Sequence, residues 1–461
     1  MNLTHPELEI SKETMRISIR ISGSVQGVGF RPYVYALASR FLLFGFVKNQ
    51  RGNVLIEVQG NRDPITSFLT ALKTELPFPA NITQMVCTPL PLNQDYQFII
   101  ETSDVTQLST ITVPPDIAPC TQCLSELADL NDRRYFYPFL SCAHCGPRFT
   151  VIKKMPYDRE RTTLQNFPLC PGCQTEFENP GDRRFHVQGL VCPECGPQWN
   201  FIRKNEENEK SIRTFTPLSD LATAINAGLI CAIKGIGGYQ ICCDARNAST
   251  VATLRQRKHR FDKPFAVMVK DLTQAELLCE ISPQEKEALL SPVRPIVLLK
   301  HRPNSRLAAE VNPGNPSLGI MLPSSPLHEL LFNKLGPIPL VMTSGNISEE
   351  PIIYQDSVAI AKLSTFTDGL LIHNRPIETG CDDSVMRFSN SREILIRRAR
   401  GFAPSAIELP FECSKSILAL GGQLKNTIAL GFDNRAILSQ HLGDLDDFST
   451  FEAYNQAILH F

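Results

Sequence analysis

Residues 120–145 read CTQCLSELADLNDRRYFYPFLSCAHC, and residues 170–195 read CPGCQTEFENPGDRRFHVQGLVCPEC. The second stretch repeats the first in register, and each stretch begins and ends with a CxxC pair. A CxxC turn presents two sulfurs to one tetrahedral Zn²⁺, so the repeat predicts a duplicated module over 114–200 with two zinc sites. The proposed ligands are Cys120, Cys123, Cys142, Cys145, Cys170, Cys173, Cys192 and Cys195.

The spacing leaves two points about these cysteines open. Adjacent pairs along the chain share a metal in one arrangement, whereas the first and third pairs interleave with the second and fourth in another. Unliganded thiols or a redox pair are the alternative to metal binding. Four thiolates leave no open coordination position, so the predicted metal sites are structural rather than catalytic.

Composition limits the class of protein. A chain of 461 residues predicts about three domains. A formal net charge of -1 argues against a protein that recruits nucleic acid through its overall field. No apolar run reaches the length of a membrane span, and residues 1–15 lack the apolar stretch of a secretion signal. These features predict a cytoplasmic protein without membrane segments.

Upstream of the cysteines, residues 14–103 alternate between strand and helix patterns. Residues 15–21 alternate apolar and polar side chains, and a helical pattern begins at Pro32. Two strands at 45–49 and 54–58, a helix at 64–76 and closing strands at 82–87 and 95–101 complete the pattern. The order β-α-β-β-α-β predicts a ferredoxin-like domain.

A glycine-containing loop joins the first strand of this domain to its first helix. It reads Gln26-Gly27-Val28-Gly29-Phe30-Arg31. Backbone N–H groups at a helix N-terminus bind anions, and an arginine there adds a bidentate donor for phosphate. A purely structural turn is the alternative interpretation of two glycines.

The sequence of this loop resembles the acylphosphatase signature. Residues 45–49 and 52–54 resemble the second motif of the same signature. The resemblance implies that Gln26, Gly27, Val28 and Gly29 form the phosphate loop. It also implies that Arg31 holds the phosphate and that Asn49 positions the attacking water. An acyl phosphate is already activated, so orientation and charge stabilisation suffice without a covalent nucleophile.

Downstream, residues 212–405 predict an α/β domain that binds a nucleotide. A helix at 218–227 and a strand at 229–234 precede the glycine-rich turn 235–238. Residues 254–264 carry five Lys or Arg directly before an apolar strand, and the loop 343–351 follows another strand with hydroxyl and amide side chains. Phosphate binding explains these features, but a solvated helix face and an ordinary surface turn are the alternatives.

These segments resemble the YrdC family, whose twisted-sheet α/β domain adenylates a carbamate-type acid with ATP. The resemblance implies that Lys258 and Arg260 form a basic pair. It places further side chains near the nucleotide, namely Lys263, Ser344, Asn346, Ser348, Arg398 and Arg400.

The whole order of domains resembles the hydrogenase maturation carbamoyltransferases, the HypF family. The segments whose sequence resembles the family most specifically are 114–120, 156–159 and 184–188. Two residues, Gly380 and Ser325, differ from those expected in the family. The resemblance implies a multidomain α+β and α/β enzyme that uses carbamoyl phosphate, ATP and Mg²⁺. The implied partner is a HypE-like protein, which accepts the carbamoyl group on its C-terminal cysteine.

Residues 416–461 look like the start of the family's actin-like transfer domain. The residues before Phe461 are too few for such a domain, so we expect a fragment that forms the adenylate without delivering it. Two other classes of protein stay open: a zinc-containing RNA-binding protein, and a scaffold that keeps the folds without catalysis.

Overall fold

The computed structural model describes residues 14–50, 53–77, 80–102, 113–203, 212–213, 216–303, 305–347 and 350–461. Contacts divide the chain into two compact units. The first contains the chain up to Val113 together with Met155–Asp158 and Thr175–Gln188. The second contains Pro114–Lys154, Arg159–Gln174 and Gly189–Phe461. In the part of the chain that the structure describes, no helix has the length and apolar character needed to cross a membrane.

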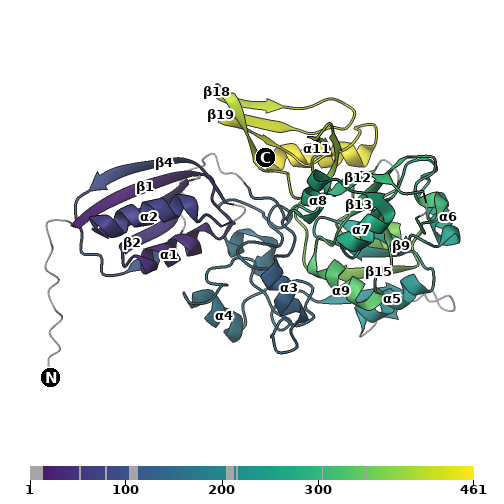
Figure 1. Ribbon diagram of the computed structural model, residues 1–461, viewed down its shortest axis with the longest axis horizontal. Helices are drawn as coiled ribbons and strands as arrows, with labels where there is room; N and C mark the ends of the chain where they lie inside the picture. The colour runs from purple at the N-terminus through teal and green to yellow at the C-terminus, as the bar shows by residue number, and fades with distance from the viewer. Residues whose placement is uncertain are drawn as a thin grey trace. The chain divides into compact units, whose positions relative to one another are not determined.

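The first unit has the predicted ferredoxin-like arrangement. Its elements are β1 (Thr14–Ser24), α1 (Phe30–Arg40), β2 (Phe44–Gln50), β3 (Asn53–Asn61), α2 (Arg62–Thr74), β4 (Asn81–Leu90) and β5 (Phe98–Ile100). The sheet order is β4-β1-β3-β2-β5, and α1 and α2 lie on one face of the sheet (Figure 1). Ile17, Ile19 and Ile21 of β1 are buried, as the period-two alternation predicts. The two predicted closing strands lie at opposite edges, because β4 pairs with β1 whereas β5 pairs with β2.

Short helices organise the cysteine-rich region. Helix α3 (Thr121–Ala128) begins directly after Cys120, and α4 (Pro171–Glu178) begins directly after Cys170. Two short 3₁₀ turns, Arg159–Arg161 and Thr163–Asn166, lie between the repeats. The described structure therefore repeats the helix position along with the cysteine spacing.

The second unit is built on one large mixed sheet. Its central strands run β17-β16-β12-β13-β10-β14-β9-β8-β15-β6-β7. Their bounds are β6 (Trp199–Arg203), β7 (Ile212–Arg213), β8 (Cys231–Lys234), β9 (Tyr239–Asp244), β10 (Ala266–Met268), β12 (Ile296–His301), β13 (Ser317–Met321), β14 (Leu340–Ser344), β15 (Gly369–His373), β16 (Val385–Ser389) and β17 (Arg392–Arg397). The short strand β11 (Cys279–Glu280) pairs with β12.

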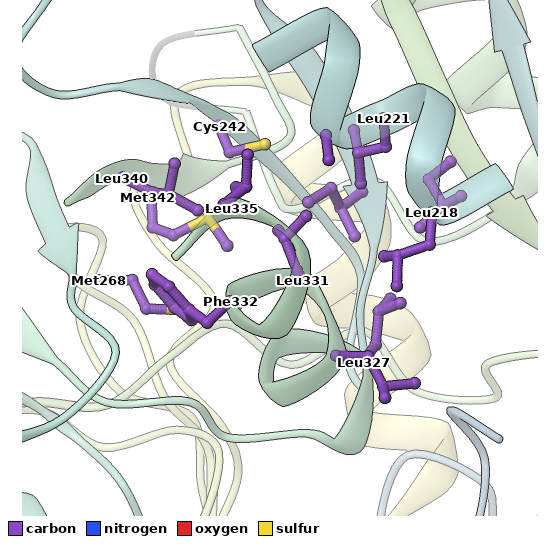
Figure 2. Close-up of a cluster of buried hydrophobic side chains, with 14 of the residues drawn as sticks. Leu218, Leu221, Cys242, Met268, Leu327, Leu331, Phe332, Leu335, Leu340 and Met342 are labelled. Atoms are coloured by element: carbon purple, nitrogen blue, oxygen red, sulfur yellow. The ribbon is translucent and has the colours of Figure 1, made fainter. Parts of the chain in front are cut away.

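Helices bury both faces of this sheet. They are α5 (Pro217–Asn226), α6 (Ala248–Arg257), α7 (Leu272–Leu278), α8 (Pro283–Leu290), α9 (Pro326–Leu335) and α10 (Asp356–Leu363). Figure 2 shows side chains of α5 and α9 packed against strand residues of one face, such as Cys242 and Met342. The neighbouring strand residues Cys243 and Val341 point to the other face and join a second core with α6, α7 and α10. Because successive strand residues point to opposite faces and both faces are buried, neighbouring residues of these strands are apolar.

Strand β6 joins the large sheet although it precedes the predicted bounds 212–405 of the α/β domain. Strand β6 follows Cys195 after three residues and pairs antiparallel with β15. Phe201 of β6 and Leu127 of α3 belong to the same buried cluster as the sheet residues. The cysteine-rich region and the α/β domain therefore share one continuous core, rather than being joined by a linker.

The last described segment forms a hairpin and a helix. Strands β18 (Ala406–Ala419) and β19 (Ala429–Leu438) pair antiparallel, and α11 (Phe448–His460) follows them (Figure 1). Ile428, Leu442 and Ala457 form their small buried cluster.

Candidate functional site

The loop between β1 and α1 has the backbone of an anion cradle. Gly27 and Gly29 have φ values of 67° and 75°, in the left-handed region that glycine adopts at low cost. Gly29 is the N-cap residue of α1, and no side chain caps this described helix end. An uncapped helix N-terminus presents backbone N–H donors to an anion. Val28 is buried in the core of the sheet domain and anchors the loop by packing.

Arg31 lies in the first turn of α1, next to an acidic side chain. A cation is unfavourable at the positive end of the helix dipole unless an anion accompanies it. Its Nη2 donates to Oδ1 of Asp158 at 2.8 Å, and both side chains are largely buried. Asp158 comes from the short segment Met155–Asp158, which packs in the same unit as the loop. The carboxylate therefore supplies a negative charge at the predicted phosphate anchor.

His186 also faces this region. Burial, followed by the positive charge of Arg31, lowers its pKa to about 4, so the imidazole is neutral near pH 7. The neighbouring Phe185 packs edge-on against Tyr35 of α1, with ring centroids 5.0 Å apart. Sequence reasoning quoted the stretches that contain Asp158 and His186 but assigned neither residue a role. The signal that could have identified them is that both are polar residues within segments that resemble the family specifically.

Two residues of this domain, Gln26 in the loop and Asn49 in β2, have buried amide side chains. Gln26 is 4% exposed, and within the described residues its side-chain oxygen and nitrogen have no hydrogen-bond partner. Buried polar atoms without partners are rare in proteins and mark places where a ligand or water binds. Asn49 lies near the end of β2, opposite Val54 of β3, and is 3% exposed. The structure thus places the predicted loop residues, Arg31 and Asn49 in one domain.

The cysteines form two four-sulfur clusters, each made of adjacent pairs. Cys120 and Cys123 meet Cys142 and Cys145, and the other cluster combines Cys170, Cys173, Cys192 and Cys195. Neighbouring sulfurs in both clusters are 3.5–3.7 Å apart. A tetrahedral Zn²⁺ with Zn–S bonds of about 2.3 Å requires sulfurs about 3.8 Å apart. The pairing left open by the spacing is therefore settled, and the donor sets fit zinc.

A cavity of about 920 Å³ opens beside the large sheet. Five of the predicted nucleotide-binding residues line it: Lys258, Arg260, Lys263, Ser344 and Asn346. Asp382, Arg397, His441 and residues of α11 line it as well, and sequence reasoning assigned no role to them. Ser348 lies outside the described residues.

Lys258 is buried beneath the 344–346 loop. Its Nζ donates to the backbone oxygens of Ser344 and Asn346 at 2.7 and 2.5 Å, and to Oδ1 of Asn346 at 2.7 Å. Burial, followed by the charge of Arg260, lowers the pKa of Lys258 to about 7. The ammonium therefore organises the loop that lines the cavity.

The arginines predicted near the nucleotide differ in their placement. Arg260 stacks on the ring of Phe265 and donates to the Lys263 carbonyl oxygen. Arg398 donates to the backbone oxygens of Ser405 and Leu438 and is not among the residues that line the cavity. Arg400 is buried in an ion pair with Asp383 at 2.7 Å. The structure therefore brings Arg260 to the cavity, together with Arg397, but not Arg398 or Arg400.

The structure explains the two residues that differ from those expected in the family, Gly380 and Ser325. A Cβ at Gly380 would lie 2.7 Å from the ring of Tyr354, so a basic side chain at that position would require this ring to move. Ser325 is the N-cap residue of α9, and its Oγ accepts from the His328 N–H. A threonine and a serine supply the same capping oxygen.

Four family models match consecutive parts of the chain. The acylphosphatase model matches residues 17–100, and the HypF finger model matches 120–152 and 169–202. The YrdC-type model, described as telomere recombination, matches 223–399. The HypF Kae1-like domain model matches 412–461.

Curated relatives match along nearly the whole chain. A carbamoyltransferase HypF from Synechocystis is 44% identical over 96% of this chain, and a probable carbamoyltransferase HypF from Methanocaldococcus jannaschii is 40% identical over 96%. This chain spans 57–58% of the length of these relatives.

Solved structures agree with the curated relatives. A full-length HypF in the phosphate- and nucleotide-bound form matches with a TM-score of 0.92 at 40% identity, over 97% of this chain and 58% of that one. HypF from T. kodakarensis matches with a TM-score of 0.89 at 38% identity, over 97% of this chain and 57% of that one. With its acylphosphatase, four-cysteine and YrdC-type regions in this order, the chain belongs to the HypF family.

Proposed function

We propose that the loop at 26–31 hydrolyses carbamoyl phosphate. Arg31 and the loop N–H groups would bind the phosphate, and Asn49 would hold the attacking water. Water attacks phosphorus, the bond from phosphorus to the carbamoyl oxygen breaks, and the products are carbamate and inorganic phosphate. Hydrogen bonds from a fixed guanidinium and backbone stabilise the charge that develops on the phosphoryl oxygens.

The cavity beside the large sheet would carry the second step. A carbamate oxygen attacks the α-phosphorus of ATP, which is bound with Mg²⁺, and the bond to the β-phosphate breaks. Carbamoyl adenylate and pyrophosphate are formed, so atoms and charge balance without a further reactant. Lys258 would hold the 344–346 loop in place, while Arg260, Lys263 and Arg397 would provide positive charge along the cavity. Exclusion of water protects the carbamate and the mixed anhydride from decomposition.

The carbamoyl group would then pass to the C-terminal cysteine of a HypE-like partner during nickel–iron hydrogenase maturation. Relatives that match over nearly the whole chain carry the name carbamoyltransferase, which supports this assignment. The two four-cysteine clusters would each hold one structural Zn²⁺. Because each thiolate set is complete, zinc would stabilise the fold without joining the reaction.

The observation that supports the proposal most is the presence of both sites in one chain. Arg31 and Asn49 lie in one ferredoxin-like domain, and the 920 Å³ cavity is lined by the predicted basic and hydroxyl residues. The matching HypF structure is itself bound to phosphate and a nucleotide.

One assay tests both steps. We expect the chain with ATP and Mg²⁺ to release pyrophosphate only when carbamoyl phosphate is present. Elemental analysis should find two zinc ions per chain. Pyrophosphate release at the same rate with and without carbamoyl phosphate would contradict the coupling of the two steps.

The two rival functions make different predictions. A zinc-containing RNA-binding protein would show salt-dependent RNA affinity and no pyrophosphate release. An inactive scaffold would hydrolyse neither carbamoyl phosphate nor ATP.

A further inference from the structure

Two arginines approach the sulfurs of the second four-cysteine cluster. Nη2 of Arg133 lies 3.3 Å from Sγ of Cys170 and 3.3 Å from Sγ of Cys192. Nη2 of Arg134 lies 3.5 Å from Sγ of Cys173. Both arginines belong to the first repeat, residues 120–145, whereas the three sulfurs belong to the second repeat, residues 170–195. The first repeat therefore supplies cationic donors to the metal-binding sulfurs of the second.

The local structure holds Arg134 in place. The Arg134 N–H donates to Oδ1 of Asp132 at 2.7 Å, and its Nε donates to the Val191 carbonyl oxygen at 2.9 Å. The Arg134 side chain is 1% exposed. A buried guanidinium that is already held by a hydrogen bond from its Nε loses little conformational freedom when it contacts a thiolate.

A difference between the repeats provides independent support. The second cluster contains Gly172 inside its first CxxC pair, whereas the corresponding residue of the first cluster is Gln122. A Cβ at Gly172 would lie 2.6 Å from Nη1 and 2.8 Å from Nη2 of Arg133. The glycine thus leaves the space that the guanidinium of Arg133 occupies.

Charge explains why such contacts matter. Four thiolates around Zn²⁺ carry a net charge of −2, and burying that charge is costly unless nearby donors compensate it. N–H donors around a metal's ligands orient them, and losing one such partner typically reduces metal affinity on the order of 10–100-fold.

We propose that Arg133 and Arg134 are positioning residues that stabilise the thiolates of the second cluster, so that the first repeat controls how firmly the second holds its metal. This inference rests on the proposed zinc occupancy. It assigns the two sites unequal dependence on these arginines, although their ligand sets are identical.

Zinc release followed cysteine by cysteine tests the proposal. The full chain is treated with a chelator, released thiols are alkylated over time, and mass spectrometry measures the modification of each cysteine. In Arg133→Gln we expect Cys170 and Cys192 to become alkylated about tenfold faster or more, with the rate at Cys120 and Cys142 unchanged. Lys154→Gln, which removes an exposed charge from the same region, should match the parent.

A second variant removes the contact without removing the charge. Gly172→Ala should push the Arg133 guanidinium away and accelerate release from the second cluster, whereas Arg133→Lys should restore part of the loss. The first cluster reports unfolding in the same molecule, because unfolding would expose both sets of cysteines. Equal acceleration at both clusters, or none in either variant, would overturn the role of the arginines. Parent protein that lacks two zinc ions would instead remove the zinc premise.

Discussion

The proposed phosphate loop and the proposed nucleotide cavity would bind the same kind of group, but they are assembled differently. Gln26 to Arg31 are contiguous, and their backbone forms the cradle. The cavity combines residues from β9, from the segment that follows α6, and from β14, β17 and α11, which lie far apart in the chain. A contiguous site depends on local backbone conformation, whereas a dispersed site depends on the packing of the whole sheet.

Their positive charges are also held differently. Arg31 pairs with the carboxylate of Asp158. Lys258 is buried against neutral oxygens, and its pKa is lowered to about 7. The cavity should therefore respond to pH near neutrality.

Arg31→Ala should produce the largest effect and separate the two sites. Loss of the charged contact to the phosphoryl group should reduce carbamoyl phosphate hydrolysis about a thousandfold. Phosphate release measures the rate, and zinc content should be unchanged. Arg40→Ala, at the exposed end of the same helix, is the control. Near-parental hydrolysis by Arg31→Ala would exclude Arg31 as the phosphate anchor.

Lys258→Ala should impair the reaction in the proposed nucleotide cavity but not the hydrolysis of carbamoyl phosphate. Three acceptors of the 344–346 loop would lose the ammonium, so pyrophosphate release should fall about 100-fold while hydrolysis at Arg31 continues. Arg260→Ala should act in the same direction. Lys300→Ala removes an exposed lysine and serves as the control. Equal loss of both reactions would mean that the two sites do not act separately.

The two sites should also differ in pH dependence. Because burial disfavours the charged form, Lys258 loses its proton as pH rises above about 7, and ATP affinity should fall up to about tenfold per pH unit. Calorimetric titration of Mg-ATP between pH 7 and 8.5 measures this. Lys258→Arg stays charged and should flatten the profile, and the KM for carbamoyl phosphate should stay constant. A flat ATP profile in the parent would show that Lys258 keeps its charge.

Asp158→Asn should have the smallest effect, on the phosphate loop. The substitution removes a negative charge beside Arg31 and keeps an acceptor oxygen, so inorganic phosphate should inhibit hydrolysis about fivefold more strongly. Glu75→Gln, which alters the exposed Arg40 pair on the same helix, should leave inhibition unchanged. Weaker inhibition would show instead that Asp158 holds Arg31 in its binding orientation.

Most of the phosphate loop could be predicted, but less of the cavity. A helix was predicted at 218–227, and α5 (Pro217–Asn226) differs from it by one residue at each end. The ferredoxin-like order was also confirmed. Both predictions succeeded because the patterns behind them are local. Arg398 and Arg400 were expected near the nucleotide, yet Arg397 lines the cavity. Arg397 ends β17, whereas Arg398 and Arg400 follow the strand and bind backbone oxygens and Asp383. A charge pattern along the sequence does not reveal which of these side chains faces the cavity.

The sequence by itself determined the repeat of paired cysteines, the glycines of the phosphate loop and the order of the domains. These features follow from neighbouring residues and from backbone conformations that only certain residues adopt. The tertiary structure decided which cysteine pairs meet, where Asp158 and Arg133 lie, and how deeply Lys258 is buried. Such contacts join residues far apart in the chain, and their energies depend on burial and distance, which only the packed fold specifies.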